Sequence, residues 1–210
     1  MKALIRPAVP GDAAQAARLS YMAGQSHLDV CIYDLMFPGD MERRLEMLGK
    51  LFTTKSPSWF HYSHHLVADV DGEVAGSLCG YFDPEAGGRV LRDAYEEAGM
   101  GRRERREMAK RLEPLMRVYP VHGHDIWVVE NVAVFPRFRR KGLLDSLLDR
   151  ILQKGRDRGF KRAELRMLIG NIPAQKAYEK AGFRIVEEFV DTEFEEIFGC
   201  PGMARMVVDL

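Results

Sequence analysis

A short basic segment stands directly before an apolar helix pattern. Arg139, Arg140 and Lys141 are followed by Gly142, and apolar residues then recur with helical spacing. The first amide groups of a helix have no partner within it and carry the positive end of its dipole. Gly142 allows a ligand to approach the backbone closely, and the three cations add charge at the same place. The segment is therefore predicted to bind a pyrophosphate group, with an ordinary solvated turn as the alternative.

Glu130 is a carboxylate within an otherwise apolar run, residues 126–134, that is typical of a central strand. Burial of a carboxylate is costly unless it has partners. Glu130 is therefore predicted either to line a wet cleft or to lie at a strand bulge, with a structural, hydrogen-bonded carboxylate as the alternative to a role in chemistry. Glu164 is a second carboxylate, in the next strand pattern.

The elements expected around these residues alternate between strands and helices. Strands are expected at residues 2–6, 65–70, 73–82, 126–134, 162–169, 183–190 and 203–210, and helices at 13–22, 41–52, 142–157 and 173–180. Asp71-Gly72 between two apolar runs predicts an antiparallel hairpin. The strand–helix–strand order over 126–169 predicts a parallel crossover, so the fold class is α/β.

The chain shows no internal repeat, no Ser/Gly linker and no low-complexity segment. One domain over residues 1–210 is therefore expected. Two segments interrupt its strand pattern with helix-favouring sequence, and helical insertions are predicted at about 26–60 and 83–121.

The composition excludes several classes of protein. Lys plus Arg (31) equals Asp plus Glu (31), so no net charge attracts nucleic acid or acidic membranes. No apolar run is long enough to span a bilayer, and a cytoplasmic protein without a membrane partner is expected. The three cysteines, Cys31, Cys79 and Cys200, suggest neither a disulfide framework nor a zinc site.

Three further segments each allow two interpretations. The Arg-rich run at 102–111 contains glutamates at helical spacing and is interpreted as a solvated face rather than a nucleic-acid surface. His61, His64 and His65 lack the spacing of a metal site, so surface or substrate-lining groups are expected. The acidic residues of 187–196 either attract a cationic amine or form an exposed strand face and loop.

The basic turn and a second segment further along the chain together resemble the GNAT superfamily of acyl-CoA-dependent N-acetyltransferases. Arg139 and Gly142 match its [RQ]xxGxx turn. Its NxxAxxxYxxxGF segment is matched by Asn171, Ala174, Tyr178, Gly182 and Phe183. The resemblance covers residues 1–22 and 126–190. It departs at Leu144, where the family usually has Gly or Ala, and Leu144 is assigned to the apolar helix stripe.

The resemblance implies a mostly antiparallel twisted sheet, with helices on both faces and a parallel central strand pair that splays apart. Acetyl-CoA is the implied cosubstrate, without a metal, and its pantetheine arm is expected between strands 126–134 and 162–169. The implied cofactor-binding residues are Val132, Ala133, Val134, Arg139, Arg140, Lys141, Gly142, Leu143, Leu144, Asn171, Ala174 and Tyr178. Asn171 is also placed to cap a helix.

The implied reaction is direct attack of a primary amine, on a small molecule, peptide or protein, at the acetyl group. Tyr178 matches the tyrosine that protonates or stabilises the CoA sulfur, because a phenol with an ordinary pKa of about 10 keeps its proton at neutral pH. The alternative is an aromatic packed on the sheet. Glu130, Glu164 or water alone would serve as the base, and His122 either reaches the acceptor pocket or ends a loop. A non-catalytic acyl-CoA-binding module is the rival function, and a homodimer is compatible with the sequence.

Overall fold

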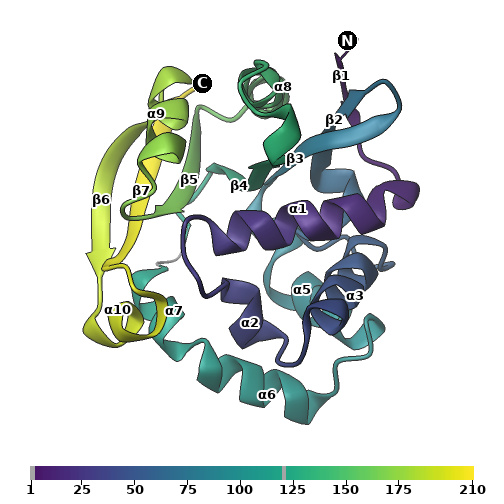
Figure 1. The fold of residues 1–210 in the computed structure, drawn as a ribbon, viewed down its shortest axis with the longest axis vertical. Helices are drawn as coiled ribbons and strands as arrows, with labels where there is room; N and C mark the ends of the chain where they lie inside the picture. Colours follow the sequence, from purple (N-terminus) through teal and green to yellow (C-terminus); the bar gives the residue numbers. More distant parts are fainter. Residues whose placement is uncertain (1–2, 120–121) are drawn as a thin grey trace.

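The computed structural model describes residues 3–119 and 122–210 (Figure 1). Lys2, the expected start of the first strand, and residues 120–121, the expected end of the second insertion, lie outside the described residues. The described strands form a seven-stranded sheet in the order β1-β2-β3-β4-β5-β7-β6. They are β1 (Ala3–Pro7), β2 (His65–Val70), β3 (Glu73–Tyr81), β4 (Trp127–Val134), β5 (Arg162–Leu168), β6 (Arg184–Val190) and β7 (Gly202–Asp209).

Ten α-helices connect the described strands. They are α1 (Ala13–Gln25), α2 (Ile32–Met36), α3 (Met41–Phe52), α4 (Asp83–Ala86), α5 (Gly88–Glu97), α6 (Arg102–Arg111), α7 (Glu113–Val118), α8 (Leu143–Asp157), α9 (Ile172–Lys180) and α10 (Thr192–Phe198). Helices α2 and α3 fall in the first predicted insertion, and α4 to α7 in the second. None of the helices in the described ranges has the length and apolar character needed to cross a bilayer.

Helices cover both faces of the sheet. Alternate residues of a strand point to opposite faces. Leu66 and Ala68 of β2 pack in one cluster with the apolar stripe of α8, whereas Val67 between them packs in another with α1. The buried stripe of α8 holds this helix against the sheet, since each buried leucine contributes roughly 1.5–3 kcal/mol. The predicted mixed sheet with helices on both faces is thus confirmed.

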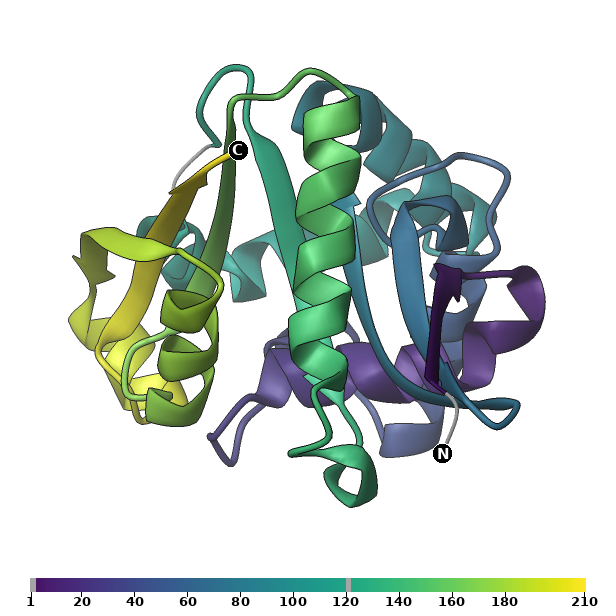
Figure 2. The same ribbon diagram turned by 90° about the horizontal axis from the view of Figure 1, so that it is seen from above.

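The central strands β4 and β5 separate along their length. They pair in parallel at two positions, Trp127 with Ala163 and Val128 with Glu164. All other strand pairs in the sheet are antiparallel. In Figure 2, β4 (teal) and β5 (green) converge near the top and diverge below. Residues 127–129 are buried and residues 131–133 are partly exposed, so exposure rises where the strands part. This confirms the parallel, splayed central pair, here called the β4–β5 splay.

A β-bulge fixes the end of β4 at this divergence. Ser77 of β3 pairs with Ala133 and Cys79 with Glu130, so β4 has one residue more than β3 between the two pairs. Asn131 lies in the bulge with a φ of 52°, a left-handed conformation that asparagine tolerates better than most residues. Its side chain accepts a hydrogen bond from the Tyr33 hydroxyl at 2.7 Å, which ties α2 to the bulge.

One expectation about the elements is wrong. Residues 192–198 form α10, where an exposed strand face and loop were expected: Asp191 caps this helix by accepting a hydrogen bond from the Phe194 amide at 2.9 Å. Pro114 lies in the first turn of α7, where proline removes no intrahelical hydrogen bond.

Close packing around Gly80 supports a prediction about stability. A Cβ at Gly80 of β3 would lie 2.6 Å from Ile151 of α8, whereas a Cβ at Gly49 of α3 meets no atom within 4 Å. Gly80→Ala is expected to lower the free energy of unfolding by about 1–3 kcal/mol through overpacking. Gly49→Ala, the matched control, is expected to raise it by roughly 0.5–1 kcal/mol because alanine favours the helix. Denaturant unfolding compares the two, and equal effects would contradict this packing.

Candidate active site

The start of α8 is open to a ligand. Gly142 is its N-cap residue, has a φ of 75° and makes no side-chain cap. Glycine adopts this left-handed conformation without steric cost. Among the described residues, no atom beyond Gly142 and its two chain neighbours lies within 4 Å of the position that a Cβ would occupy at Gly142. The amides of Leu143, Leu144 and Asp145 at the start of the helix therefore have room for an anionic group.

The predicted cations of the basic turn have different surroundings. The Arg139 Nε donates a hydrogen bond at 3.1 Å to the carbonyl of Val134, which ties the turn to the end of β4. Arg140 is exposed and has a φ of 61°, an uncommon conformation for a residue with a side chain. The Lys141 Nζ lies 5.4 Å from the centre of the Phe138 ring. The turn thus presents Arg140 and Lys141 at its surface and uses Arg139 as an anchor.

Alternation along β4 determines where its last backbone groups point. The Phe135 amide donates to the Ala75 carbonyl of β3 at 2.9 Å, so Phe135 faces β3. Neighbouring residues of a strand direct their backbone groups to opposite sides. Val134 therefore directs its amide and carbonyl toward the β5 side, where the strands have parted. Arg139 occupies one lone pair of that carbonyl, which leaves the Val134 amide as the donor toward the splay.

Glu130 lies on the face of β4 opposite to α8. Trp127 and Val129 pack against α8, so Val128 and Glu130 point the other way. The Glu130 Oε2 accepts a hydrogen bond from the Tyr81 hydroxyl at 2.9 Å. Burial raises the pKa of Glu130 to about 7, although the charge of Arg166 and the Tyr81 bond oppose this rise. A half-buried carboxylate with a pKa near neutrality has the properties of a general base.

Glu164, the second candidate base, is held in a different way. Its side chain is fully buried, and its Oε1 accepts hydrogen bonds from His122 at 2.5 Å and from Arg166 at 3.0 Å. Burial by itself raises the pKa of Glu164, but His122, Arg166 and Arg205 bring it below its ordinary value. Glu164 is therefore a fixed carboxylate that holds cations.

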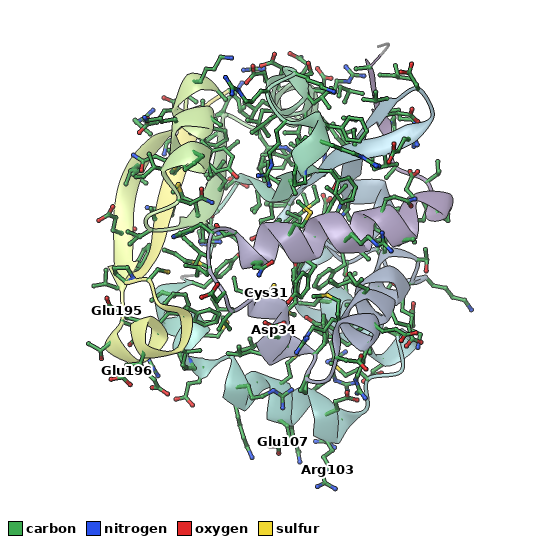
Figure 3. The ribbon with its side chains drawn as sticks, in the orientation of Figure 1. Cys31, Asp34, Arg103, Glu107, Glu195 and Glu196 are labelled. Carbon is green, nitrogen blue, oxygen red and sulfur yellow. The ribbon has the colours of Figure 1, made fainter. Side chains whose placement is uncertain are left out.

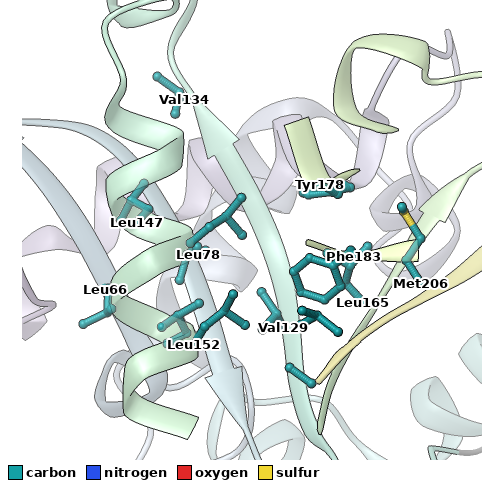
Figure 4. Packing of buried hydrophobic residues seen from close by; sticks show 14 of the residues in the cluster. Leu66, Leu78, Val129, Val134, Leu147, Leu152, Leu165, Tyr178, Phe183 and Met206 are labelled. Atoms are coloured by element: carbon teal, nitrogen blue, oxygen red, sulfur yellow. The ribbon is translucent and has the colours of Figure 1, made fainter. Parts of the chain in front are cut away.

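Tyr178 projects from α9 into the core between α8 and the outer strands. Figure 4 shows it beside Phe183 and Leu165, and the Tyr178 and Phe183 rings meet edge to face with centroids 6.3 Å apart. Burial raises the pKa of Tyr178 to about 12, so the phenol keeps its proton at neutral pH. The Tyr178 hydroxyl makes no hydrogen bond with another described residue, and its proton is available to a ligand.

The other predicted cofactor residues have structural roles. The Asn171 side chain caps α9 by accepting from the Ala174 amide at 3.2 Å, and it donates to the Ser26 hydroxyl at 2.6 Å. The alternative of a helix cap at Asn171 is confirmed. Leu144 and Ala174 pack against the main core cluster, in agreement with the place of Leu144 in the apolar stripe.

The predicted histidine role is wrong for His65. This residue is buried and meets Phe52 edge to face, with ring centroids 5.1 Å apart. Burial lowers the pKa of His65 to about 3, so it is a neutral core side chain. His61 bonds to Ser63 at 2.8 Å and His64 to the carbonyl of Pro57 at 3.0 Å. No three His, Cys, Asp or Glu side chains in the described ranges are grouped as metal ligands.

The charged segments away from the splay are solvated. Figure 3 shows Arg103 and Glu107 of α6, and Glu195 and Glu196 of α10, pointing away from the body of the protein. Arg117 of α7 forms ion pairs with the start of the acidic segment, with Asp191 at 2.7 Å and with Glu193.

Sequence reasoning missed Tyr81 as a functional residue. Its contact with Glu130 depends on the register between β3 and β4, in which Cys79 lies opposite Glu130 and Tyr81 opposite Val128. These strands are joined through the long helical segment that contains α4 to α7, so no short turn determines their register. Tyr81 is two positions after Cys79 on β3, so the two side chains share a face of the strand. This alternation is the local sequence signal that places Tyr81 on the face of Cys79.

Comparisons with known proteins agree with this geometry. Residues 38–183 match the family model described as the acetyltransferase (GNAT) family, a range that contains β4, α8 and α9. An N-acetyltransferase from Staphylococcus aureus Mu50 has a similar structure, with a TM-score of 0.70, 23% identity, and 98% of this chain and 100% of that chain covered. A GCN5-related N-acetyltransferase from Kribbella flavida is also similar, with a TM-score of 0.61, 17% identity, and 99% and 98% covered.

A third similar structure is that of N-acetylglutamate synthase from Neisseria gonorrhoeae in complex with coenzyme A and N-acetylglutamate. Its TM-score is 0.53 at 14% identity, with 100% of this chain and 35% of that chain covered. A search of curated protein sequences gave no significant match. The family model covers well over half of the chain, and its motif residues lie around the β4–β5 splay. The chain therefore belongs to the GNAT family of acyl-CoA-dependent acetyltransferases.

Proposed function

We propose that this protein transfers the acetyl group of acetyl-CoA to a primary amine of a small molecule, peptide or protein. One observation carries the proposal: Glu130, with its raised pKa, lies at the β4–β5 splay on the face opposite to α8. Tyr178 lies on the α8 face of the same splay. A base for the amine and an acid for the sulfur are thus separated by the strands between which the thioester is expected.

The residues around the start of α8 fit coenzyme A. The amides of Leu143 and Leu144, with Gly142 and the exposed cations Arg140 and Lys141, would hold the diphosphate. Backbone groups of Val132 and Val134 would bind the pantetheine arm as an added strand does. Asn171 and α9, which it caps, would cover the far side of the pantetheine arm. When bound, acetyl-CoA supplies an activated carbonyl for attack.

Two protons must move in the proposed reaction. A bond forms between the amine nitrogen and the acetyl carbon, and the carbon–sulfur bond breaks. Glu130 takes the proton that the amine nitrogen loses, and its pKa near 7 suits this exchange at neutral pH. The Tyr178 hydroxyl holds a proton for the leaving sulfur, because its pKa of about 12 keeps it protonated. The amide and the free thiol are the products.

The two helical insertions support an acceptor site on the face of the sheet that carries Glu130. Within a single domain spanning residues 1–210, the insertions at about 26–60 and 83–121 carry α2 and α3, and α4 to α7, on the Glu130 side. Tyr33 and Tyr119, one from each insertion, reach the polar groups there: Tyr33 bonds Asn131, and the Tyr119 ring stacks under Arg166 at 4.2 Å. These segments are placed to select the amine.

Thiol release from acetyl-CoA in the presence of a panel of primary amines tests the function. The proposal expects at least one amine to accelerate release, in proportion to enzyme concentration. The rival function, a non-catalytic acyl-CoA-binding module, expects cofactor binding by calorimetry without acceleration by any amine. Binding without turnover across small-molecule, peptide and protein amines would favour the rival.

A further inference from the structure

A continuous chain of polar side chains extends from Glu130 toward the protein surface. The Tyr81 hydroxyl donates to Glu130 at 2.9 Å and lies 3.5 Å from the His122 Nε2. The His122 Nδ1 contacts the Glu164 Oε1 at 2.5 Å. The chain therefore crosses β3, β4, β5 and the segment before β4, elements that are far apart in the sequence.

Burial sets a direction along this chain. Tyr81 is 2% exposed and Glu164 is 0% exposed, whereas the His122 side chain is 9% exposed. The neighbours of His122 along the chain, residues 123–125, are exposed. Of Tyr81, Glu164 and His122, His122 is therefore the nearest to solvent, and Glu130 at the other end of the chain is itself half-buried.

Hydrogen bonding determines which nitrogen of His122 carries the proton. Glu164 is ionised, since His122 and the arginines bring its pKa below the ordinary value despite burial, and a carboxylate only accepts. The Nδ1 therefore donates to Glu164, and in neutral His122 the Nε2 is an acceptor, with the Arg166 Nη1 at 3.0 Å and the Tyr81 hydroxyl at 3.5 Å.

Two arginines surround the pair formed by His122 and Glu164. The Arg166 Nη1 lies 2.8 Å from the His122 Nδ1 and 3.0 Å from its Nε2, and the Arg166 Nη2 donates to Glu164 at 3.0 Å. The Arg205 Nη1 is 3.7 Å from the other Glu164 oxygen. These charges hold Glu164 ionised, so the anchor of His122 persists through the cycle.

We propose that Tyr81 and His122, the latter fixed by Glu164, position the Glu130 carboxylate and pass the proton that it takes up to solvent. The proton on Glu130 moves to the Tyr81 oxygen while the Tyr81 hydroxyl proton moves to the His122 Nε2. Glu130 is then a carboxylate again, Tyr81 is unchanged in charge, and His122 is a cation that loses its proton to water. This assignment rests on the proposed function of Glu130 as the base.

Carboxyl carbon NMR of Glu130 tests the positioning role of Tyr81 without any turnover. In the wild type the Glu130 carboxyl is expected to titrate near pH 7. Tyr81→Phe removes a hydrogen bond that favours the charged form, so the midpoint is expected to rise by about one pH unit. Asp83 and Arg166 also act on the Glu130 charge, and both remain in this variant. An unchanged midpoint would overturn the role of Tyr81.

Rescue by imidazole tests the proton-transfer role of His122. His122→Gln keeps a donor for Glu164 but cannot carry a proton onward, so kcat is expected to fall about tenfold or more and to recover with added imidazole. His124→Gln, at an exposed position in the same segment, is the control and is expected to keep full kcat. Full kcat in His122→Gln, or a loss that imidazole leaves unchanged, would overturn the proton transfer through His122.

If no amine supports turnover by the wild type, the proposed function and the proton transfer through His122 fail together. The Glu130 titration still decides the role of Tyr81 in that case.

Discussion

Glu130→Gln is expected to lower kcat by about 100- to 1,000-fold, the range in which a positioned general base contributes. Glutamine keeps the size of the side chain and an acceptor for the Tyr81 hydroxyl, but it cannot take a proton. Because burial raises the pKa of Glu130 to about 7, wild-type kcat/KM should rise with pH through about 7 as the carboxylate ionises. The variant should lack this rise. Initial rates of thiol release across pH 5.5–9 (roughly the range spanned by the titration) provide the comparison.

Stability separates the catalytic role of Glu130 from a purely structural one. The pKa of Glu130 is raised in the folded protein. At pH values between the ordinary pKa of a glutamate and about 7, the native state therefore binds more protons than the unfolded chain. The free energy of unfolding therefore falls as pH rises through this window, and the loss is complete above it. Removing the charge should make Glu130→Gln at least as stable as the wild type at pH 8. Glu188→Gln, at an exposed position of β6, is the matched control. A Glu130→Gln protein that keeps full kcat but unfolds more easily would identify a structural carboxylate instead.

Tyr178→Phe is expected to lower kcat by about 100-fold while leaving the fold and cofactor binding intact. The phenyl ring can keep its contact with Phe183, and the lost hydroxyl leaves no described partner unsatisfied. The pKa of Tyr178, about 12 because of burial, means that its proton is present throughout the working pH range. The defect should therefore be the same at every pH below about 9, which distinguishes it from that of Glu130→Gln.

The control for Tyr178 is Tyr62→Phe, another ring-preserving change at a partly exposed tyrosine that is not among the predicted site residues. Single-turnover and steady-state thiol release measure the chemical step in both variants. Wild-type rates in Tyr178→Phe, with unchanged coenzyme A affinity, would restrict Tyr178 to packing between α9 and the core.

Local patterns predicted most of the elements that build the site. The hairpin of β2 and β3 follows from Asp71 and Gly72, which both adopt positive φ in the structure. The apolar stripe predicted α8, and α3 begins at a local cap, since the Asp40 side chain accepts from the Arg43 amide at 2.9 Å. Each of these features depends on residues within a few positions of one another, so the sequence contains the information locally.

Features that depend on distant partners could not be predicted in the same way. The contact between Tyr81 and Glu130 requires the β3–β4 register and the bulge at Asn131, and both are fixed by packing of segments far apart in the chain. His65 was expected at the surface or in a substrate pocket because its side chain is polar, but it is buried in the core. α10 was missed because its acidic residues resemble an exposed strand face until Asp191 is recognised as its cap.

The amide NMR spectrum of the protein during titration with coenzyme A tests the central claim most directly. The account predicts that the amides of residues 142–145, at the start of α8, shift together with those of 132–134 at the end of β4, because the diphosphate and the pantetheine arm bind there. Gly142→Val, strained at a φ of 75°, should weaken both sets of shifts. Saturable coenzyme A binding that leaves these amides unmoved, or binding unaffected by Gly142→Val, would contradict the account.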